Sequence, residues 1–514
     1  MNKNSGSSIS KIRRTGLKVM KKNGYELRGY QKRGVFWMIK RELASKYRGG
    51  ILADDPGLGK TIQTMALMAS CPKKTLIIVP TAVLEQWKSI CIQVFDRESV
   101  YVHFGPDKLR TKTKIMKLEF NICITTHGSA ISRKKGTIES VLHIPDLWER
   151  VIIDEGHVIR NKKTKMNKAA MLYSSISPVN WLLTGTPVQN KVSDIISLLS
   201  FMGMSRTKIK TDLELYISSH LLRRTKKVLM DETFEDYEYN TNLVPFSTKE
   251  EQELYFNIER AALEDLADAK YSGTSEKEYN MKVLETYIRE SQACSHPQIA
   301  LDSIALKYGE EFNREFSGDS TKMERIVADI ILAEGMSLVF CHFNTEMQRI
   351  ASSLDENDVS SEFYDGSMSH RERELTLKKF RSESSGSPKV LIIQIMAGGV
   401  GLNLQNFSNV FILSPDWNPT NEIQAIARAH RFGQKKKVTV NKYLVVYNRE
   451  FMKIGGDIDE NCTTIDERIL ERQKEKRVLM ARLLKDDTLS FNEKIRLNDI
   501  VNPSRESIVS DFII

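Results

Sequence analysis

The sequence predicts an α/β fold of two lobes, each with a sheet of parallel strands. Short apolar, β-branched runs alternate with helical stretches, a pattern typical of buried parallel strands. The first set comprises GGILA (49–53), TLIIVP (75–80), ICITT (122–126), RVIID (150–154) and WLLTG (181–185). The second set, after a long gap, comprises SLVFCHF (337–343), KVLIIQI (389–395), NVFILS (409–414) and VTVNKYLVV (438–446). A chain of 514 residues is also long enough for two or three domains.

Two further segments have helical character. Between the two sets of strands, EEQELYFNIERAALEDLADA combines helical spacing with dense charge, which predicts a helical protrusion and linker. After the second set, TTIDERILERQKEKRVLMARLL opens with Thr464 and Glu467 at the spacing of a capping box. We therefore expect a charged helix after the second lobe.

Composition and charge are those of an ordinary folded protein. Hydrophobic residues make up 41% and charged residues 28% of the chain. The formal net charge of +10 suits a polyanionic partner. The cysteines form no CxxC pair, which argues against a zinc ribbon, a RING domain or a disulfide framework. No apolar run has the length of a membrane span and no secretory signal is visible, so we expect an intracellular protein without a membrane partner.

The stretch DDPGLGKT (54–61) lies between a predicted strand and the predicted helix TIQTMALMAS. It has Asp54 where a phosphate loop usually has its first glycine, but it keeps Gly57, Gly59, Lys60 and Thr61. Glycines let backbone N–H groups turn toward phosphate oxygens, and the helix dipole favours an anion. In such a loop the lysine reaches the β- and γ-phosphates and the threonine binds Mg²⁺. The alternative is a glycine-rich turn without a ligand.

Two adjacent carboxylates, Asp154 and Glu155, follow the buried strand RVII. An unpaired charge at the end of a buried apolar strand is costly, so acids at this place point to a function. We expect Asp154 to hold Mg²⁺ and Glu155 to orient the attacking water.

In the second lobe, QAIARAHRFGQ (424–434) places Arg428 and Arg431 three residues apart, which puts both on one face of a predicted helix. An arginine aimed at a γ-phosphate stabilises the transition state of phosphoryl transfer. A structural ion pair is the alternative. Two other stretches, LLTGTPVQN (182–190) and LLRRTKKVL (221–229), are weak signals by themselves.

The order of these motifs resembles that of the Swi/Snf-type, helicase-related ATPases of superfamily two, over about residues 25 to 485. LRGYQKRGVFWM (27–38) looks like the adenine-side motif of this family, with Gln31 on the base. The acidic pair before the glycines is normal for the family. The resemblance implies two RecA-like lobes that bind ATP and Mg²⁺. It implies catalytic roles for Lys60, Asp154, Glu155, Arg428 and Arg431, and nucleotide contacts at Gln31, Asp55, Gly57, Gly59, Lys60, Thr61 and Gln424, with Thr61 and Asp154 on the metal.

Other matching motifs look like those that face nucleic acid in the family, among them LIIVPTAVLEQW (76–87), ITTHGS (124–129), IMAGGVGLNL (395–404) and SPDWNP (414–419). The implied DNA contacts are Gln86, Thr125, Thr126, Gly399, Asn403 and Trp417. A packing role is the alternative for each, and Trp417 has the size of a packing anchor.

Three features depart from the family pattern. Pro56 stands where a methionine is usual, Ile395-Met396 replaces a dipeptide that often contains Ser or Thr, and residues 447–462 are inserted. HVIRN (157–161) and TGTPVQNKVSDIISLLSFM (184–202) look most like the branch of transcription-termination factors and RING-bearing repair translocases. Since RING cysteines are lacking, ubiquitin-ligase activity is not implied. A motor without targeting modules also resembles those of large DNA viruses.

Together, the sequence pattern and the resemblance predict the following division of the chain: a basic N-terminal tail (1–24), the first RecA-like lobe (25–235), the helical protrusion and linker (236–320), the second lobe (321–447), an insertion (448–462), a brace helix (463–485) and a C-terminal tail (486–514). We expect a double-stranded DNA translocase, acting as a monomer, that remodels or displaces nucleosomes or RNA polymerase complexes. The alternatives are an ATP-gated DNA clamp without translocation and a transcript-release factor. The expected location is the nucleus, or a cytoplasmic viral factory or virion for a viral protein.

Overall fold

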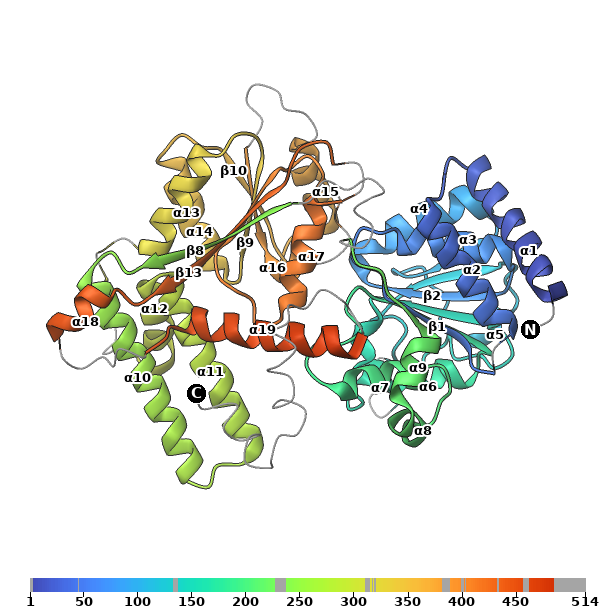
Figure 1. Ribbon diagram of the computed structural model, residues 1–514, viewed down its shortest axis with the longest axis horizontal. Helices are drawn as coiled ribbons and strands as arrows, with labels where there is room; N and C mark the ends of the chain where they lie inside the picture. The colour runs from blue at the N-terminus through green and yellow to red at the C-terminus, as the bar shows by residue number, and fades with distance from the viewer. Residues whose placement is uncertain are drawn as a thin grey trace. The chain divides into compact units, whose positions relative to one another are not determined.

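The structure is a computed structural model (Figure 1) that describes residues 3–44, 46–132, 137–226, 237–309, 315–316, 318, 320–380, 389–398, 402, 404–431, 434–455 and 462–484. The chain divides into two compact units. The first holds the residues up to Phe234, and the second holds most of the residues from Glu235 onward. Among the helices of the described ranges, none is both long enough and apolar enough to cross a bilayer.

Within its described residues, the first unit has a seven-stranded parallel sheet with the strand order β3-β4-β2-β5-β6-β1-β7. The strands are β1 (Arg48–Leu52), β2 (Thr75–Val79), β3 (Val100–His103), β4 (Ile122–Thr126), β5 (Arg150–Asp154), β6 (Val179–Leu183) and β7 (Leu221–Leu222). The five central strands are those that the apolar runs predict. The edge strands β3 and β7 were not predicted, because one is only half-buried and the other has two residues.

Successive residues of these strands face two different hydrophobic cores. Ile77 packs with helices α1 (Lys3–Lys22), α2 (Gly29–Ala44), α3 (Lys60–Ser70) and α4 (Leu84–Phe95). Ile78, the next residue, packs with α5 (Lys112–Met116), α6 (Lys165–Ser175), α7 (Val192–Ser200), α8 (Arg206–Thr211) and α9 (Leu213–His220). Burial on both faces explains why the strands are continuous apolar runs.

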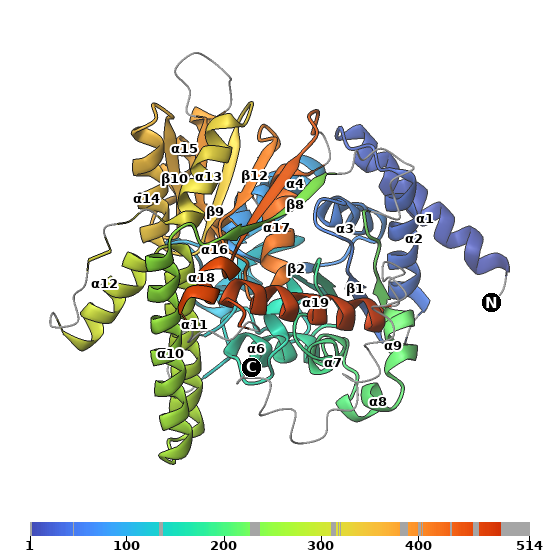
Figure 2. The same ribbon diagram turned by 60° about the vertical axis from the view of Figure 1, so that its left-hand side comes forward.

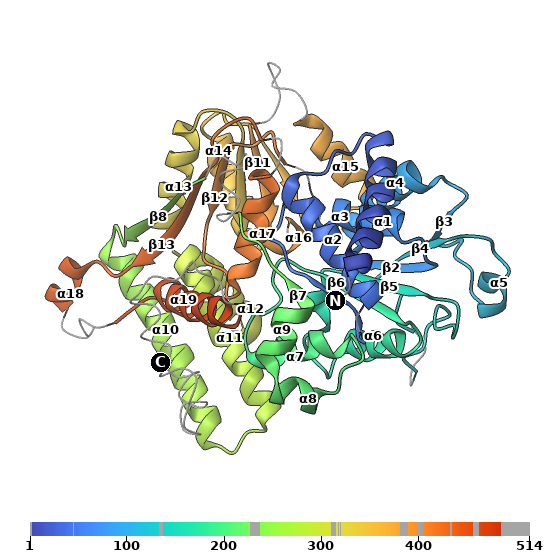
Figure 3. The same ribbon diagram turned by 45° about the vertical axis from the view of Figure 1, so that its right-hand side comes forward.

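Helix α1 occupies the segment expected to be a basic tail. Ile9 and Met20 are buried in the core of the first unit, and α1 lies against α3 (Figure 3). The two helices approach closely at Gly16, where a Cβ atom would lie 2.0 Å from Ser70 Oγ. The apolar residues Ile9, Ile12 and Met20 recur at helical spacing here but stand among many polar and basic residues, and this helix was not predicted.

The second unit has, in its described part, a six-stranded parallel sheet with the order β10-β11-β9-β12-β13-β8. The strands are β8 (Glu238–Pro245), β9 (Ser337–Cys341), β10 (Ser361–Tyr364), β11 (Val390–Gln394), β12 (Asn409–Ile412) and β13 (Thr439–Val446). The two sheets confirm the predicted fold class. The two edge strands were missed: β8 has the polar sequence EYNTNLVP and is largely exposed, and β10 is short with only Tyr364 buried.

Helices α13 (Thr321–Leu332) and α14 (Asn344–Asp355) share a core with the second sheet, whereas α16 (Ile395–Gly398) and α17 (Pro419–Ala429) lie against β11 and β12. α15 (His370–Lys379) lies beside β10. Helices α10 (Lys249–Tyr271) and α11 (Glu276–Ser295) run side by side, followed by α12 (Pro297–Tyr308) (Figure 2).

The expected insertion contains α18 (Arg449–Gly455), and its residues 456–461 lie outside the described ranges. The expected brace helix is α19 (Ile465–Leu484), whose Ile465 and Ile469 are buried in a core of the second unit with Tyr255. The expected C-terminal tail (486–514) lies outside the described residues.

Candidate active site

The predicted phosphate loop connects β1 to α3 in the first unit. Gly57 and Gly59 have φ angles of 90° and 77°, which glycine adopts without strain, and Lys60 is the first residue of α3. A Cβ atom at position 59 would lie 2.4 Å from Gln31 Nε2, which donates a hydrogen bond of 3.2 Å to the carbonyl oxygen of Leu58. The structure therefore brings Gln31 and the glycine loop together.

Lys60 lies among four acidic residues. Its Nζ donates a hydrogen bond of 2.7 Å to the carbonyl oxygen of Asp54. Burial lowers the pKa of Lys60, and the negative charges of Glu155, Asp54, Asp154 and Asp55 oppose that shift. The structure thus places the lysine of the loop next to the two acids that end β5.

Asp154 is held by its neighbours through both carboxylate oxygens. Oδ2 accepts a hydrogen bond of 2.8 Å from Trp87 Nε1 on α4, and Oδ1 accepts one of 2.9 Å from the backbone N–H of Glu155. Burial and the adjacent Glu155 raise the pKa of Asp154 to about 6. A bound cation at this carboxylate would offset that shift.

Glu155 has a left-handed backbone conformation with φ of 50°. Such a conformation is costly for a residue other than glycine and concentrates at functional sites. Its Oε2 lies 3.3 Å from Nδ1 of His157, and that nitrogen lies 3.3 Å from Thr184 Oγ1. The acids at the end of β5 are therefore linked to the loop that follows β6.

Pro56 packs against that same loop. A Cβ atom at position 185 would lie 2.9 Å from Cγ and Cδ of Pro56, so the proline ring occupies the space that Gly185 leaves. The backbone N–H of Thr184 also donates a hydrogen bond of 3.1 Å to the carbonyl oxygen of Leu52, the last residue of β1. The proline that departs from the family pattern is therefore in packing contact with the loop after β6.

The residues present fit a magnesium-bound nucleotide. The hydroxyl of Thr61 and the carboxylate of Asp154 are oxygen ligands of the kind that Mg²⁺ prefers. Lys60 and the glycine loop at the start of α3 are suited to phosphate oxygens. Gly59, with no Cβ, lets the side-chain amide of Gln31 lie directly against this loop.

The second unit carries the predicted arginines on and just after α17. Gln424 and Arg428 are buried residues of this helix. The helix ends at Ala429, and His430 leaves the helical conformation with ψ of 79°. The expectation that Arg428 and Arg431 share a helical face is therefore wrong, because Arg431 follows the end of the helix. Burial lowers the pKa of Arg431.

The expected DNA contacts differ in their surroundings. Gln86 is a half-buried residue of α4. Thr125 and Thr126 are buried in β4, where Thr125 Oγ1 donates to the carbonyl oxygen of His103 and Thr126 Oγ1 accepts from the N–H of Ser129. Their buried side chains do not support the expected direct contacts, and the exposed residue at this strand end is Gly128.

Trp417 is 41% exposed in the second unit. Its ring lies edge-on to Tyr287 with 5.4 Å between centroids, and Lys476 Nζ lies 4.8 Å from the ring centroid. Trp417 therefore combines packing with an accessible surface. Gly399 and Asn403 lie outside the described residues.

Two arginines of the stretch LLRRTKKVL, for which no role was predicted, hold the acidic pair of the phosphate loop. Arg224 binds the carboxylate of Asp54, and Arg223 Nη2 lies 3.1 Å from Asp55 Oδ1. Asp55 Oδ2 also accepts a hydrogen bond from the backbone of Lys226, so this carboxylate contacts protein groups through both oxygens. The adjacent pairs Asp54-Asp55 and Arg223-Arg224 were the available sequence signal.

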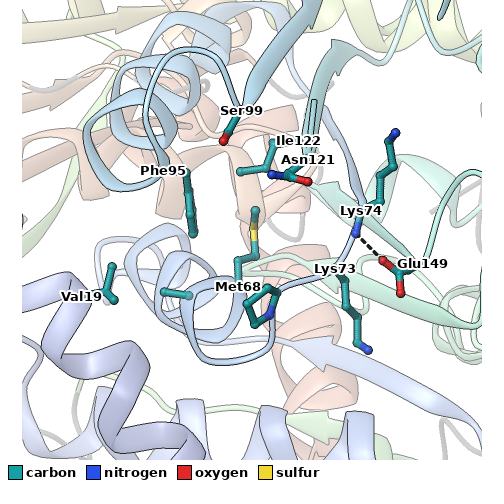
Figure 4. Close-up of a pocket in the computed structure, with 11 residues that line it drawn as sticks. Val19, Met68, Lys73, Lys74, Phe95, Ser99, Asn121, Ile122 and Glu149 are labelled. Carbon is teal, nitrogen blue, oxygen red and sulfur yellow. Dashed lines mark hydrogen bonds between the residues drawn. The ribbon is translucent and has the colours of Figure 1, made fainter. Parts of the chain in front are cut away.

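A pocket of about 470 Å³ lies elsewhere in the first unit (Figure 4). It is lined by residues after α3 and near the amino ends of β2 and β4, including Pro72, Lys73, Lys74 and Asn121. Parallel strands carry their ligand sites at the carboxyl ends, and none of the predicted site residues lines this pocket.

Two family models match the chain. The model of the SNF2-related domain matches residues 30–208, and the model of the helicase conserved C-terminal domain matches residues 322–433. The SWI/SNF-related matrix-associated actin-dependent regulator of chromatin subfamily A member 1 of Mus musculus is 27% identical over 87% of this chain and 42% of its own length.

A viral protein is similar over most of its own length. The probable global transactivator of Orgyia pseudotsugata multicapsid polyhedrosis virus is 29% identical over 81% of this chain and 86% of its own length. A solved structure, the Sulfolobus solfataricus SWI2/SNF2 ATPase core in complex with dsDNA, is 26% identical, with 93% of this chain and 96% of that chain covered and a TM-score of 0.38. The chain spans less than half the length of its mouse relative.

Proposed function

Because this chain belongs to the Swi/Snf-type, helicase-related ATPases of superfamily two, we propose that it is a DNA-dependent ATPase that moves along double-stranded DNA and displaces or remodels the complexes bound there. The observation that carries this proposal is the grouping of Lys60, Asp154 and Glu155 around a glycine loop in the first unit. A lysine, a metal ligand and a second acid are the parts that ATP hydrolysis requires.

Each candidate site residue of the first unit has a proposed role in nucleotide binding or hydrolysis. Lys60 and the N–H groups of the glycine loop hold the β- and γ-phosphates, and Gln31 contacts the base. Thr61 and Asp154 hold Mg²⁺, which neutralises charge on the phosphates. Glu155 orients the attacking water. Asp55 acts indirectly, because Arg223 and the backbone of Lys226 bind its carboxylate.

The second unit supplies Arg428 and Arg431, which we assign to the γ-phosphate in the ATP-bound state. Positive charge from a second unit makes hydrolysis depend on the approach of the two units. Gln424 supports the nucleotide from α17. This dependence couples the chemistry to a change in the arrangement of the units, and repeated cycles move the protein along DNA.

We propose that contact with DNA is mainly to the phosphate backbone, as the net charge of +10 favours. Gln86 on α4 and the accessible part of Trp417 are the described residues that support such contacts. The loop after β4 offers Gly128 in place of the buried Thr125 and Thr126.

The viral relative is named a probable global transactivator and the mouse relative a regulator of chromatin, which supports nucleosomes or transcription complexes as the objects acted on. The same names support a nuclear or viral site of action.

The test is an ATPase assay with duplex DNA, single-stranded DNA and RNA side by side, combined with displacement of a third strand from a DNA triplex. Stimulation that is greatest with duplex DNA, together with triplex displacement, is expected. Duplex-stimulated hydrolysis without displacement identifies a clamp that does not translocate. Greatest stimulation by RNA identifies an RNA-directed factor.

A further inference from the structure

We propose that Arg223 and Arg224 are positioning residues that hold the phosphate loop in its nucleotide-binding form through Asp54 and Asp55. We call these four residues the arginine clamp. The proposal rests on the ATPase function proposed above and assigns residues that do not themselves contact the nucleotide.

Arg224 holds Asp54 with the two-pronged geometry that guanidinium groups make with carboxylates. Its Nε donates a hydrogen bond of 2.8 Å to Asp54 Oδ1, and its Nη2 binds Oδ2 of the same carboxylate. Asp54 is fully buried. A buried carboxylate needs such a partner, because an unpaired charge in the interior is strongly disfavoured.

Arg224 also connects the loop to the two helices beside it. Its Nη2 donates a hydrogen bond of 2.7 Å to Gln63 Oε1 on α3, and its Nη1 donates to the carbonyl oxygen of Tyr30 on α2. Gln63 Nε2 in turn donates a hydrogen bond of 2.9 Å to Asp54 Oδ2. Gly34 makes this arrangement possible, because a Cβ atom there would lie 2.1 Å from Gln63 Oε1.

Arg223 connects the loop to the neighbouring strand end. Its Nη2 lies 3.1 Å from Asp55 Oδ1, and its Nη1 donates hydrogen bonds to the carbonyl oxygens of Ala53, at 3.2 Å, and Gly185, at 3.0 Å. One guanidinium group thus fixes the start of the phosphate loop relative to the loop after β6, which also packs on Pro56.

Backbone hydrogen bonds bring the clamp arginines to this position. The N–H of Ala53 donates a bond of 2.7 Å to the carbonyl oxygen of Leu222, and the N–H of Asp55 donates one of 3.0 Å to that of Arg224. Residues 221–224 therefore run beside the phosphate loop as an extension of the pairing between β1 and β7.

Fixing Asp54 has a direct consequence for Lys60. The carbonyl oxygen of Asp54 accepts the 2.7 Å hydrogen bond from Lys60 Nζ, so the position of the Asp54 backbone determines where the ammonium group lies. Loosening the clamp should therefore misplace Lys60 and the loop N–H groups together, which weakens the binding of ATP.

The test measures KM for ATP, kcat and thermal stability for Arg224→Lys and Gly34→Ala. Lysine keeps the charge but cannot bind Asp54, Gln63 and Tyr30 at once. Gly34→Ala keeps every clamp residue and displaces Gln63 and Arg224 by its methyl group, in a helix that accepts alanine. We expect both variants to raise KM by at least about tenfold, the effect of losing one charge-assisted hydrogen bond.

The control is Arg150→Lys. Arg150 and Glu42 form a fully buried ion pair in the same unit, with Arg150 at the amino end of β5, away from the phosphate loop. This variant should lower the melting temperature and leave KM unchanged. The proposal is overturned if Arg224→Lys and Gly34→Ala lower stability but leave KM as in the unsubstituted protein, or if Arg150→Lys raises KM equally.

Lys60→Ala separates this result from a failure of the proposed function. If Lys60→Ala retains ATP hydrolysis, the assignment of the nucleotide site itself is wrong. If Lys60→Ala is inactive and the clamp variants have normal KM, only the arginine clamp is rejected.

Discussion

Trp87 Nε1 donates a hydrogen bond of 2.8 Å to Oδ2 of Asp154. The indole is buried on α4, next to Gln86, and the carboxylate ends β5. A residue proposed to face DNA is therefore adjacent in sequence to one that holds the proposed metal ligand. The contact also lowers the pKa of Asp154, opposing the larger effects of burial and of Glu155.

ATP hydrolysis should decrease as the pH falls through about 6 at low Mg²⁺ concentration, because protonated Asp154 cannot hold a cation. Trp87→Phe removes the hydrogen bond that lowers the pKa of Asp154. The acidic limb of the pH profile, where kcat/KM falls with decreasing pH, should therefore move to higher pH. The measurement is kcat/KM against pH at several Mg²⁺ concentrations, and excess Mg²⁺ should move the limb back toward lower pH.

The matched control is Trp148→Phe. Trp148 is equally buried, and its Nε1 donates to the carbonyl oxygen of Leu142 instead of to a carboxylate. This variant should leave the acidic limb in place. An unchanged limb in Trp87→Phe would contradict the assignment of the titration to Asp154.

Lys60→Ala should lower ATP turnover by at least about 100-fold, because a preorganised cation at the phosphates is lost. Duplex DNA binding should remain measurable by fluorescence anisotropy, since that binding depends on other surfaces. Lys168→Ala, an exposed lysine on α6, serves as the control. Normal turnover in Lys60→Ala would exclude this loop as the phosphate site.

Glu155→Gln should bind ATP and hydrolyse it at least about 100-fold more slowly, since the neutral amide lacks the negative charge and one of the acceptor oxygens that orient the attacking water. Equilibrium binding of ATP and single-turnover hydrolysis measure the two effects separately. Parallel losses of affinity and turnover would show that Glu155 serves the nucleotide instead of the water.

Arg431→Ala should lower kcat by about 1,000-fold or more and change ATP affinity much less, as expected for a charge that acts on the transition state. Arg325→Ala, in an exposed pair with Asp329 on α13, is the control in the same unit. A large loss of ATP affinity with normal kcat would rule out the proposed role of Arg431.

Gly185→Ala should raise KM for ATP, because the new methyl group would lie 2.9 Å from the ring of Pro56 and push on the phosphate loop. The strain of such overpacking is about 1–3 kcal/mol. Adding Pro56→Ala should restore KM by removing the ring atoms. The absence of rescue in the double variant would show that the two loops do not communicate through this contact.

The strands at the centre of each sheet were predictable because burial on both faces leaves a continuous apolar run, as in TLIIVP. The edge strand β8 was not, since its exposed residues need no apolar pattern and its stability comes from pairing with β13. Helix α1 was missed although its buried residues Ile9 and Met20 lie on an apolar face at helical spacing, because polar and basic residues dominate the segment.

The proposed site was predictable where a local pattern determines the geometry. The glycine loop and the acids after β5 are such patterns, and the structure brings Lys60, Asp154 and Glu155 together. The stretch LLRRTKKVL was only a weak signal, and the pairing within the arginine clamp was not predicted, because Arg224 meets Asp54 across 170 residues of sequence. Nor does the sequence indicate that Arg431 lies beyond the end of α17 or that Thr125 is inaccessible.

Strand β8 has a mechanical consequence. It is the first described strand after the segment that joins the two units, and it pairs with β13 in parallel over its whole length, from Glu238 to Pro245. In a parallel ladder the hydrogen bonds are evenly spaced, so all of them resist the sliding of one strand along the other at the same time. A force applied along the axis of β8 would therefore act as shear on all eight residue pairs of this ladder at once.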